Sequence, residues 1–154
     1  MEYVIGYGSL IDPEERRQIG LSPEAEAVRM RGYRRSWNVK ASNKKTYLGV
    51  SASRSGLINA VLFPVNEEQL SQLDGRESAY NRSEVEAADV TARLDPSARI
   101  WIYVTKPEWI SEAADPACAV KRGYVDTVIG GCLSYGEAFC TEFIATTDAW
   151  KQYW

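Results

Sequence analysis

Residues 3–10 read YVIGYGSL, a short apolar segment followed at once by two glycines. The first three residues favour a buried strand, and Gly6 and Gly8 end it in a turn. Glycine lets the backbone turn tightly and brings its N–H groups close to a ligand. Successive N–H groups in such a turn form a nest for an anion, with the Ser9 hydroxyl as a further donor. The spacing matches neither a phosphate loop nor a dinucleotide fingerprint, and a tight turn that simply needs glycine is the structural alternative.

A second candidate segment, residues 73–80, reads LDGRESAY. Here a short helix is expected to end, with Gly75 able to take the left-handed conformation and Glu77 at the entrance to a strand. A carboxylate at that junction can point into a cleft rather than into bulk water. The alternative is an exposed ion pair with Arg76, worth about 0–1 kcal/mol and without functional meaning.

Histidine is absent from the sequence. Its absence excludes a Ser-His-Asp triad, a Cys-His pair and any His-ligated metal. An enzyme with this sequence must therefore move protons with Asp, Glu, Lys, Tyr or Cys. The three cysteines, Cys118, Cys132 and Cys140, suit a reducing compartment and are interpreted as small buried hydrophobes rather than as a disulfide framework or a metal site.

Basic residues are concentrated in one segment, although the net charge is −3. No acidic residue lies between Ala27 and Asn66, and the basic residues there are Arg29, Arg31, Arg34, Arg35, Lys40, Lys44, Lys45 and Arg54. This pattern fits a solvated strand face, a steering surface for a small anion, or a nucleic-acid footprint, and the acidic pI of about 5.1 argues against the last. No apolar run approaches the roughly 20 residues of a membrane span, and the amino terminus lacks a basic signal region, so a soluble, cytoplasmic protein is expected.

The remaining patterns predict one α+β domain over residues 1–154. Asp12 and Pro13 start a short helix that stops near Gly20, and Asn66 forms a capping box with Gln69 for a helix over 67–73. Strands are expected over 27–40, 46–53, 57–65, 80–92 and 98–105, with the apolar run 100–104 in the middle of the sheet. Two helices should close the chain, because apolar residues then recur at helical spacing, at Val120, Tyr124, Val128 and Cys132 and again at Phe139, Phe143 and Ala145.

Four segments together resemble the γ-glutamylcyclotransferase superfamily, which includes the glutathione-degrading ChaC-like proteins and the AIG2-like proteins. These segments are YVIGYGSL at 3–10, NAVLF at 59–63, LDGRE at 73–77 followed by Tyr80, and IWIYV at 100–104. They occur in the family's order over residues 3–105. The Tyr-Gly-Ser-Leu loop is the most diagnostic of them, and the two carboxyl-terminal helices match less specifically.

The resemblance implies a mixed, strongly curved β-barrel flanked by helices. It implies a reaction without cofactor or metal, in which a γ-glutamyl amine or peptide cyclises to 5-oxoproline and releases the amine. Glu77 is the implied general acid and base, in agreement with the absence of histidine. The implied substrate-binding residues are Tyr7, Gly8, Ser9 and Leu10, through backbone N–H groups, with Tyr80 and Tyr103 lining the pocket.

Residues 78–82 read SAYNR, whereas ChaC-like proteins have Lys and Gly residues before the Tyr. This departure weakens an expectation of glutathione specificity and makes the chain more similar to AIG2-like members. The alternatives are a related γ-glutamylamine lyase or amidohydrolase, a catalytically idle AIG2-like small-ligand binding module, and a nucleic-acid binder that uses residues 29–54. The expected partner is a small γ-glutamyl molecule, with no nucleic acid and no membrane, and a monomer is favoured.

Overall fold

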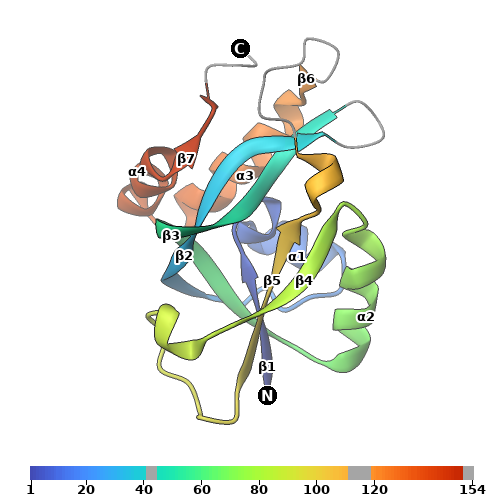
Figure 1. Cartoon of the computed structure of the whole chain (residues 1–154), viewed down its shortest axis with the longest axis vertical. Helices are drawn as coiled ribbons and strands as arrows, with labels where there is room; N and C mark the ends of the chain where they lie inside the picture. Colours follow the sequence, from blue (N-terminus) through green and yellow to red (C-terminus); the bar gives the residue numbers. More distant parts are fainter. Residues whose placement is uncertain (41–44, 111–118, 151–154) are drawn as a thin grey trace.

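A mixed β-sheet forms the centre of the computed structural model, which describes residues 1–40, 45–110 and 119–150 (Figure 1). Its seven strands run in the order β4-β5-β1-β3-β2-β7, with β6 paired to β3. The strands are β1 (Glu2–Gly6), β2 (Glu26–Lys40), β3 (Lys45–Val65), β4 (Tyr80–Val85), β5 (Arg99–Thr105), β6 (Ala119–Val120) and β7 (Thr147–Asp148).

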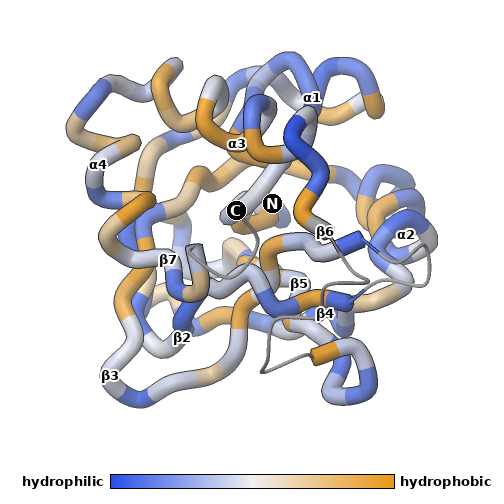
Figure 2. Tube along the Cα trace, turned by 90° about the horizontal axis from the view of Figure 1, so that it is seen from above, coloured by the Kyte–Doolittle hydropathy of each residue, from blue (hydrophilic) through white to orange (hydrophobic). Residues whose placement is uncertain are grey.

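The described residues include four α-helices around the sheet, and α2 and α4 lie on opposite sides of the molecule in both views (Figures 1 and 2). They are α1 (Pro13–Gln18), α2 (Glu67–Arg76), α3 (Arg122–Ser134) and α4 (Glu137–Ala145). Short 3-10 helices are η1 (Ser9–Ile11), η2 (Ala87–Asp89) and η3 (Pro107–Trp109). Hydrophobic residues colour much of α3, whereas α1 and α2 carry extended hydrophilic stretches (Figure 2). None of the helices in the described ranges combines the length and apolarity needed to cross a bilayer.

Strand β1 positions the glycine loop at one edge of the sheet. It pairs parallel with β5 and antiparallel with β3, so its carboxyl end and that of β5 lie at the same edge. Strand β4 begins at that edge too, because Tyr80 pairs with Thr105. The segment after Gly6, the start of β4 and the end of β5 therefore meet, although they are far apart in the sequence.

The α+β class, the mixed sheet and the two closing helices are confirmed, but closure into a barrel is wrong. Within the described residues the strand order begins at β4 and ends at β7 without a ring. The strand expected over 80–92 is also shorter, since the chain leaves β4 after Val85 and forms η2. Strand β5 lies inside the sheet between β4 and β1, as its apolar sequence predicted.

The two strands expected over 46–53 and 57–65 are one strand, β3. Ala52 pairs with Tyr33 and Leu57 with Arg31, so residues 53–56 lie opposite Gly32 at a bulge of the long hairpin. The backbones approach closely there, and a Cβ on Gly56 would lie 2.2 Å from the Tyr33 carbonyl oxygen. The polar, glycine-containing sequence thus marks a bulge rather than a loop.

Both predicted helix starts are confirmed. The Asp12 side chain accepts a hydrogen bond from the Glu14 N–H at 3.2 Å. In the capping box before α2, Asn66 Oδ1 accepts from the Gln69 N–H at 2.8 Å, and Gln69 Oε1 accepts from the Asn66 N–H at 2.9 Å.

The expected left-handed Gly75 is wrong, because this glycine stays helical and α2 continues to Arg76. Two cysteines, Cys132 and Cys140, are free and buried as predicted, and Cys118 lies outside the described residues.

Candidate active site

The glycine loop is a closed turn in which two backbone N–H groups have no backbone acceptor among the described residues. The Ile11 N–H donates to the Gly8 carbonyl at 3.0 Å, and the Asp12 N–H donates to the Ser9 carbonyl at 3.1 Å, which closes η1. In the described part of the chain, the N–H groups of Gly8 and Leu10 have no backbone acceptor. The turn folds back so tightly that a Cβ on Gly6 would lie 3.0 Å from the Leu10 carbonyl oxygen. The loop therefore has free donors of the kind that hold an anion.

Glu77 is the residue that caps the carboxyl end of α2. Its N–H donates to the Leu73 carbonyl at 2.8 Å, and its own carbonyl accepts from the Tyr80 N–H at 3.0 Å, so its backbone is fixed between helix and strand. Its carboxylate has no hydrogen-bond partner among the described residues. Burial raises the pKa of this carboxyl, and the charge of Arg76 opposes the rise only in part.

The alternative for Glu77, an ion pair with Arg76, is not formed among the described residues. Arg76 Nη2 lies 3.0 Å from Glu15 Oε1 on α1. Both side chains are partly exposed, so this pair contributes little to stability. Arg76 is therefore paired with Glu15 and not with the Glu77 carboxylate.

Tyr7, Tyr80 and Tyr103 line the site, and each of their hydroxyls donates a hydrogen bond to another residue of the protein. The Tyr7 hydroxyl donates to the Tyr103 carbonyl at 2.7 Å, and the Tyr103 hydroxyl donates to Asp74 Oδ1 at 2.8 Å. The Tyr80 hydroxyl donates to the Leu48 carbonyl at 2.8 Å. These bonds hold each ring in one position, and they connect the loop to β5, β5 to α2, and β4 to β3.

One cavity of about 40 Å³ brings together all seven residues singled out from the sequence. It is lined by Ile5, Gly6, Tyr7, Gly8, Ser9, Leu10, Leu48, Glu77, Tyr80, Tyr103 and Tyr124. A larger cavity of about 340 Å³ adjoins it and shares Ser9, Glu77, Tyr80 and Tyr124. The catalytic and substrate-binding roles of these residues remain predictions.

Tyr124 is the site residue that the sequence reasoning missed. It belongs to the helical stripe of α3 that was interpreted as core, yet it lines both cavities. Burial, and then the nearby charge of Glu77, raise the pKa of its hydroxyl, while hydrogen bonds with Leu48 and Ser9 oppose the rise. A Cβ on Gly8 would lie 3.1 Å from the Tyr124 hydroxyl, so this hydroxyl sits directly against the loop. The only signal in the sequence was a hydroxyl-bearing ring in a stripe of otherwise apolar residues.

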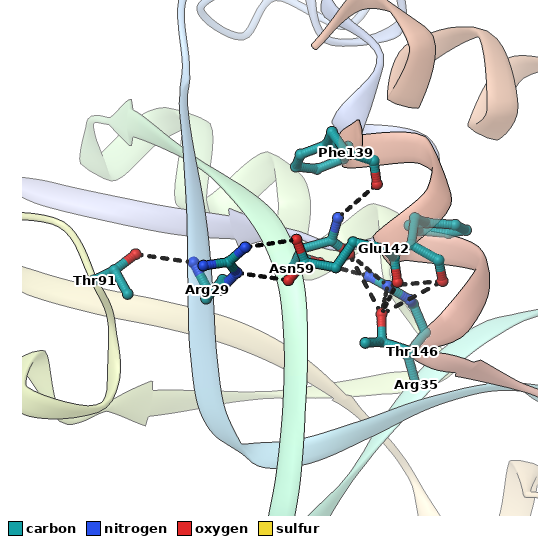
Figure 3. Close-up of polar contacts among 8 residues, drawn as sticks. Arg29, Arg35, Asn59, Thr91, Phe139, Glu142 and Thr146 are labelled. Carbon is teal, nitrogen blue, oxygen red and sulfur yellow. Dashed lines mark hydrogen bonds and ion pairs between the residues drawn. The ribbon is translucent and has the colours of Figure 1, made fainter. Parts of the chain in front are cut away.

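Three arginines of the basic segment are paired with acids from other elements. Arg29 pairs with Glu142 at 2.6 Å, as Figure 3 shows, and Arg34 pairs with Asp148 at 2.9 Å. Arg31 lies 3.7 Å from Asp89, and Arg35 is fully buried. These pairings weaken the basis for an anion-steering or nucleic-acid surface along this segment.

Comparison with known proteins points to one family. The family model described as "Gamma-glutamyl cyclotransferase, AIG2-like" matches residues 4–123. No curated protein matches the sequence significantly.

Solved structures share the fold at low sequence identity. One titled "Gamma-glutamyl cyclotransferase" has a TM-score of 0.70 and 15% identity, with 99% of this chain and 92% of that chain covered. An uncharacterized protein from Homo sapiens has a TM-score of 0.70 and 15% identity, with 94% and 86% covered. A cyclotransferase described as specific to glutathione, from yeast, has a TM-score of 0.63 and 12% identity, with 95% and 96% covered. At these identities the likeness shows the fold.

Proposed function

Because the chain belongs to the AIG2-like γ-glutamyl cyclotransferase family, we propose that it cyclises a γ-glutamyl amine or peptide to 5-oxoproline, with Glu77 as general acid and base. The observation that carries the proposal is the Glu77 carboxylate, which is partly buried, has no hydrogen-bond partner among the described residues and lines the same cavity as the glycine loop. A carboxyl with a raised pKa beside free backbone donors suits proton transfer next to a developing anion.

The substrate supplies its own nucleophile in this reaction. Glu77 takes a proton from the α-ammonium group, and the nitrogen lone pair then attacks the γ-carbonyl carbon to close a five-membered ring. The bond from this carbon to the departing nitrogen breaks as Glu77 returns the proton to that nitrogen. The extra proton on the ring nitrogen then passes to the released amine, which leaves as an ammonium ion. Ring closures of this kind reach effective molarities on the order of 10⁵ M or more, so no enzyme nucleophile is required.

The two adjoining cavities support a division of the substrate. The smaller cavity, which the loop lines, suits the glutamyl group, because the N–H groups of Gly8 and Leu10 have no backbone acceptor within the described ranges. The larger cavity also borders Glu77 and suits the departing amine. Glu77 lines both, as a group must if it takes a proton on one side and returns it on the other.

A substrate panel tests the proposal. The protein is incubated with γ-glutamyl amino acids, γ-glutamyl amines and glutathione, and 5-oxoproline and the released amine are measured by mass spectrometry. Equal amounts of the two products are expected from at least one member of the panel. Saturable binding without any 5-oxoproline would instead support the idle binding module, and release of free glutamate would support an amidohydrolase.

The turnover number should rise with pH through a midpoint above the usual glutamate value of 4.5, because Glu77 must be ionised to accept the proton and burial raises its pKa. No histidine is present to add an ionisation near neutrality. A profile measured at saturating substrate checks this expectation. Arg76→Gln should move the midpoint further upward, since Arg76 lowers the Glu77 pKa. A midpoint at or below 4.5 would contradict the assignment of Glu77 as the base.

A further inference from the structure

Two arginines are fully buried beside the glycine loop without an acidic partner. Arg16 on α1 and Arg35 on β2 both have 0% exposure. Within the described residues, neither guanidinium forms an ion pair with a carboxylate. Buried charges in proteins are normally matched by an opposite charge, because leaving one unmatched is costly. Two unmatched charges at one loop therefore call for a physical explanation.

Arg35 binds neutral acceptors and reaches the start of the loop. Its Nη1 donates to the Tyr7 carbonyl at 3.2 Å and to the Asn59 carbonyl at 2.7 Å. Its Nη2 donates to Asn59 Oδ1 at 2.9 Å and to the Thr146 hydroxyl at 2.8 Å, as Figure 3 shows. Burial lowers the pKa of Arg35 to about 9, so the group stays charged at neutral pH.

The carboxylate that acts on Arg35, that of Glu142, is already paired with Arg29. Glu142 on α4 acts on Arg35 electrostatically, but both of its oxygens bind Arg29, at 2.6 and 3.1 Å. Figure 3 shows this pair beside the Arg35 cluster. The charge of Glu142 is thus shared with a surface arginine and does not neutralise Arg35.

Arg16 holds the other end of the loop. Its Nη1 donates to the Leu10 carbonyl at 2.6 Å and to the Ile11 carbonyl at 2.9 Å. Its remaining N–H groups donate to neutral oxygens of Ser22, Pro23 and Tyr135. Both guanidiniums therefore have their donors occupied, and neither is free to contact a ligand directly.

The two arginines bind carbonyl groups at both ends of the loop, and these bonds fix the direction in which the peptide groups of the loop point. The N–H and the carbonyl of one trans peptide point in opposite directions. Because the Tyr7 carbonyl points to Arg35, the Gly8 N–H of the same peptide points away from it. Because the Leu10 carbonyl points to Arg16, the Ile11 N–H points back into the turn, where it binds the Gly8 carbonyl.

We infer that Arg16 and Arg35 are positioning residues whose unmatched charge makes the loop selective for a carboxylate, the α-carboxylate of the glutamyl group. The identification of this carboxylate rests on the proposed function. The arginines act through the loop and its field, while the backbone N–H groups make the contact. The bound carboxylate then supplies the counter-charge that the free protein lacks.

Two small probes that differ in one carboxylate test the inference. 5-Oxoproline carries the carboxylate, and pyrrolidin-2-one is the same ring without it. Dissociation constants for both are measured by NMR titration with the wild-type chain. The ratio of the two constants is the readout, because a general loss of packing weakens both probes alike.

Arg35→Gln and Arg16→Gln remove the charge, and Arg35→Lys and Arg16→Lys keep it. Each glutamine variant should lower the preference for 5-oxoproline on the order of ten-fold, whereas each lysine variant should keep it within about three-fold. Arg34→Gln is the matched control, since Arg34 is adjacent in sequence but exposed and paired with Asp148. It should leave the preference unchanged. If the glutamine variants do not fold, the lysine variants decide alone, and loss of the preference in them overturns the inference.

The outcomes separate this inference from the proposed function. Equal weakening of both probes in the glutamine variants, or a wild-type chain without preference for the anion, overturns the inference even if 5-oxoproline is formed from the substrate panel. A preference that depends on the arginines, in a chain that cyclises no γ-glutamyl compound, supports the inference while the proposed reaction fails.

Discussion

Glu77→Gln is expected to lower the turnover of a γ-glutamyl substrate by about 10²–10⁴-fold, which is the usual contribution of general acid–base catalysis. Glutamine keeps the size of the side chain, but it cannot accept the ammonium proton or return it to the departing nitrogen. Substrate affinity should change far less, because the loop N–H groups and the rings of Tyr80 and Tyr103 remain. Steady-state kinetics, with 5-oxoproline measured by mass spectrometry, gives both parameters.

The same substitution should stabilise the fold at neutral pH. Burial raises the folded-state pKa of Glu77 above its unfolded value, so ionisation of this group costs stability once the pH passes the unfolded pKa. Removing the ionisable group removes that cost. Urea unfolding at pH 7 should therefore show a higher midpoint for Glu77→Gln, and the difference should disappear at acidic pH.

Glu68→Gln is the matched control for both effects, since Glu68 is an exposed acid in the first turn of the same helix. It should leave turnover unchanged and should not raise the unfolding midpoint. Near-normal turnover in Glu77→Gln, with the fold intact by circular dichroism, would falsify the role assigned to Glu77.

Gly131→Ala should destabilise the protein and impair the site together. Helix α3 packs so closely on the end of η1 that a Cβ on Gly131 would lie 2.8 Å from the Asp12 Cα and backbone nitrogen. Such overpacking costs about 1–3 kcal/mol, against a helix-propensity gain of up to about 1 kcal/mol, so a net loss of stability is expected. The helix also carries Tyr124, and a misplacement of about 1 Å can cost on the order of 10²-fold in rate.

Gly130→Ala is the neighbouring control on the same helix. No atom lies within 4 Å of a Cβ at that position, and the residue is exposed. This substitution should stabilise by up to about 1 kcal/mol through helix propensity and should leave activity unchanged. Thermal unfolding and kinetics of the two variants check the prediction. Equal behaviour of both would show that α3 does not need its close approach to η1.

Much of the fold could be predicted because short-range rules decide it. The cap at Asp12 and the capping box at Asn66 and Gln69 satisfy backbone donors within a few residues, so sequence spacing is sufficient evidence. The apolar segments at 3–5 and 100–104 predicted strands inside the sheet, because a strand with both faces buried has an uninterrupted apolar sequence. Residues 53–56 were wrongly predicted to separate two strands, because a bulge and a loop have the same composition. Only the pairing with the partner strand distinguishes them.

The candidate site was predictable where a motif marks it and not where tertiary contacts build it. The glycine loop and Glu77 lie in segments with recognisable local chemistry. Tyr124 shares its helical period with core residues, and only the packing of α3 on η1 brings it to the loop. Arg35 was interpreted as part of a solvated strand face and Arg16 was not singled out, because their acceptors are carbonyls whose positions depend on the whole fold. A helical period or a charge pattern contains no information about such partners.

The pairing of β1 has a consequence for a chain that emerges from the ribosome one end first. This strand is synthesised before its partners, which are residues 61–65 of β3 and 99–101 of β5. Until then an apolar strand and the loop attached to it have no sheet to join, whereas the β2–β3 hairpin can form from neighbouring sequence. The cavity can form only after α3 has been made, because Tyr124 on that helix is one of its lining residues. The nascent domain therefore has an unpaired apolar strand until the partner residues of β3 and β5 have been made, which is a period when chaperones bind such segments.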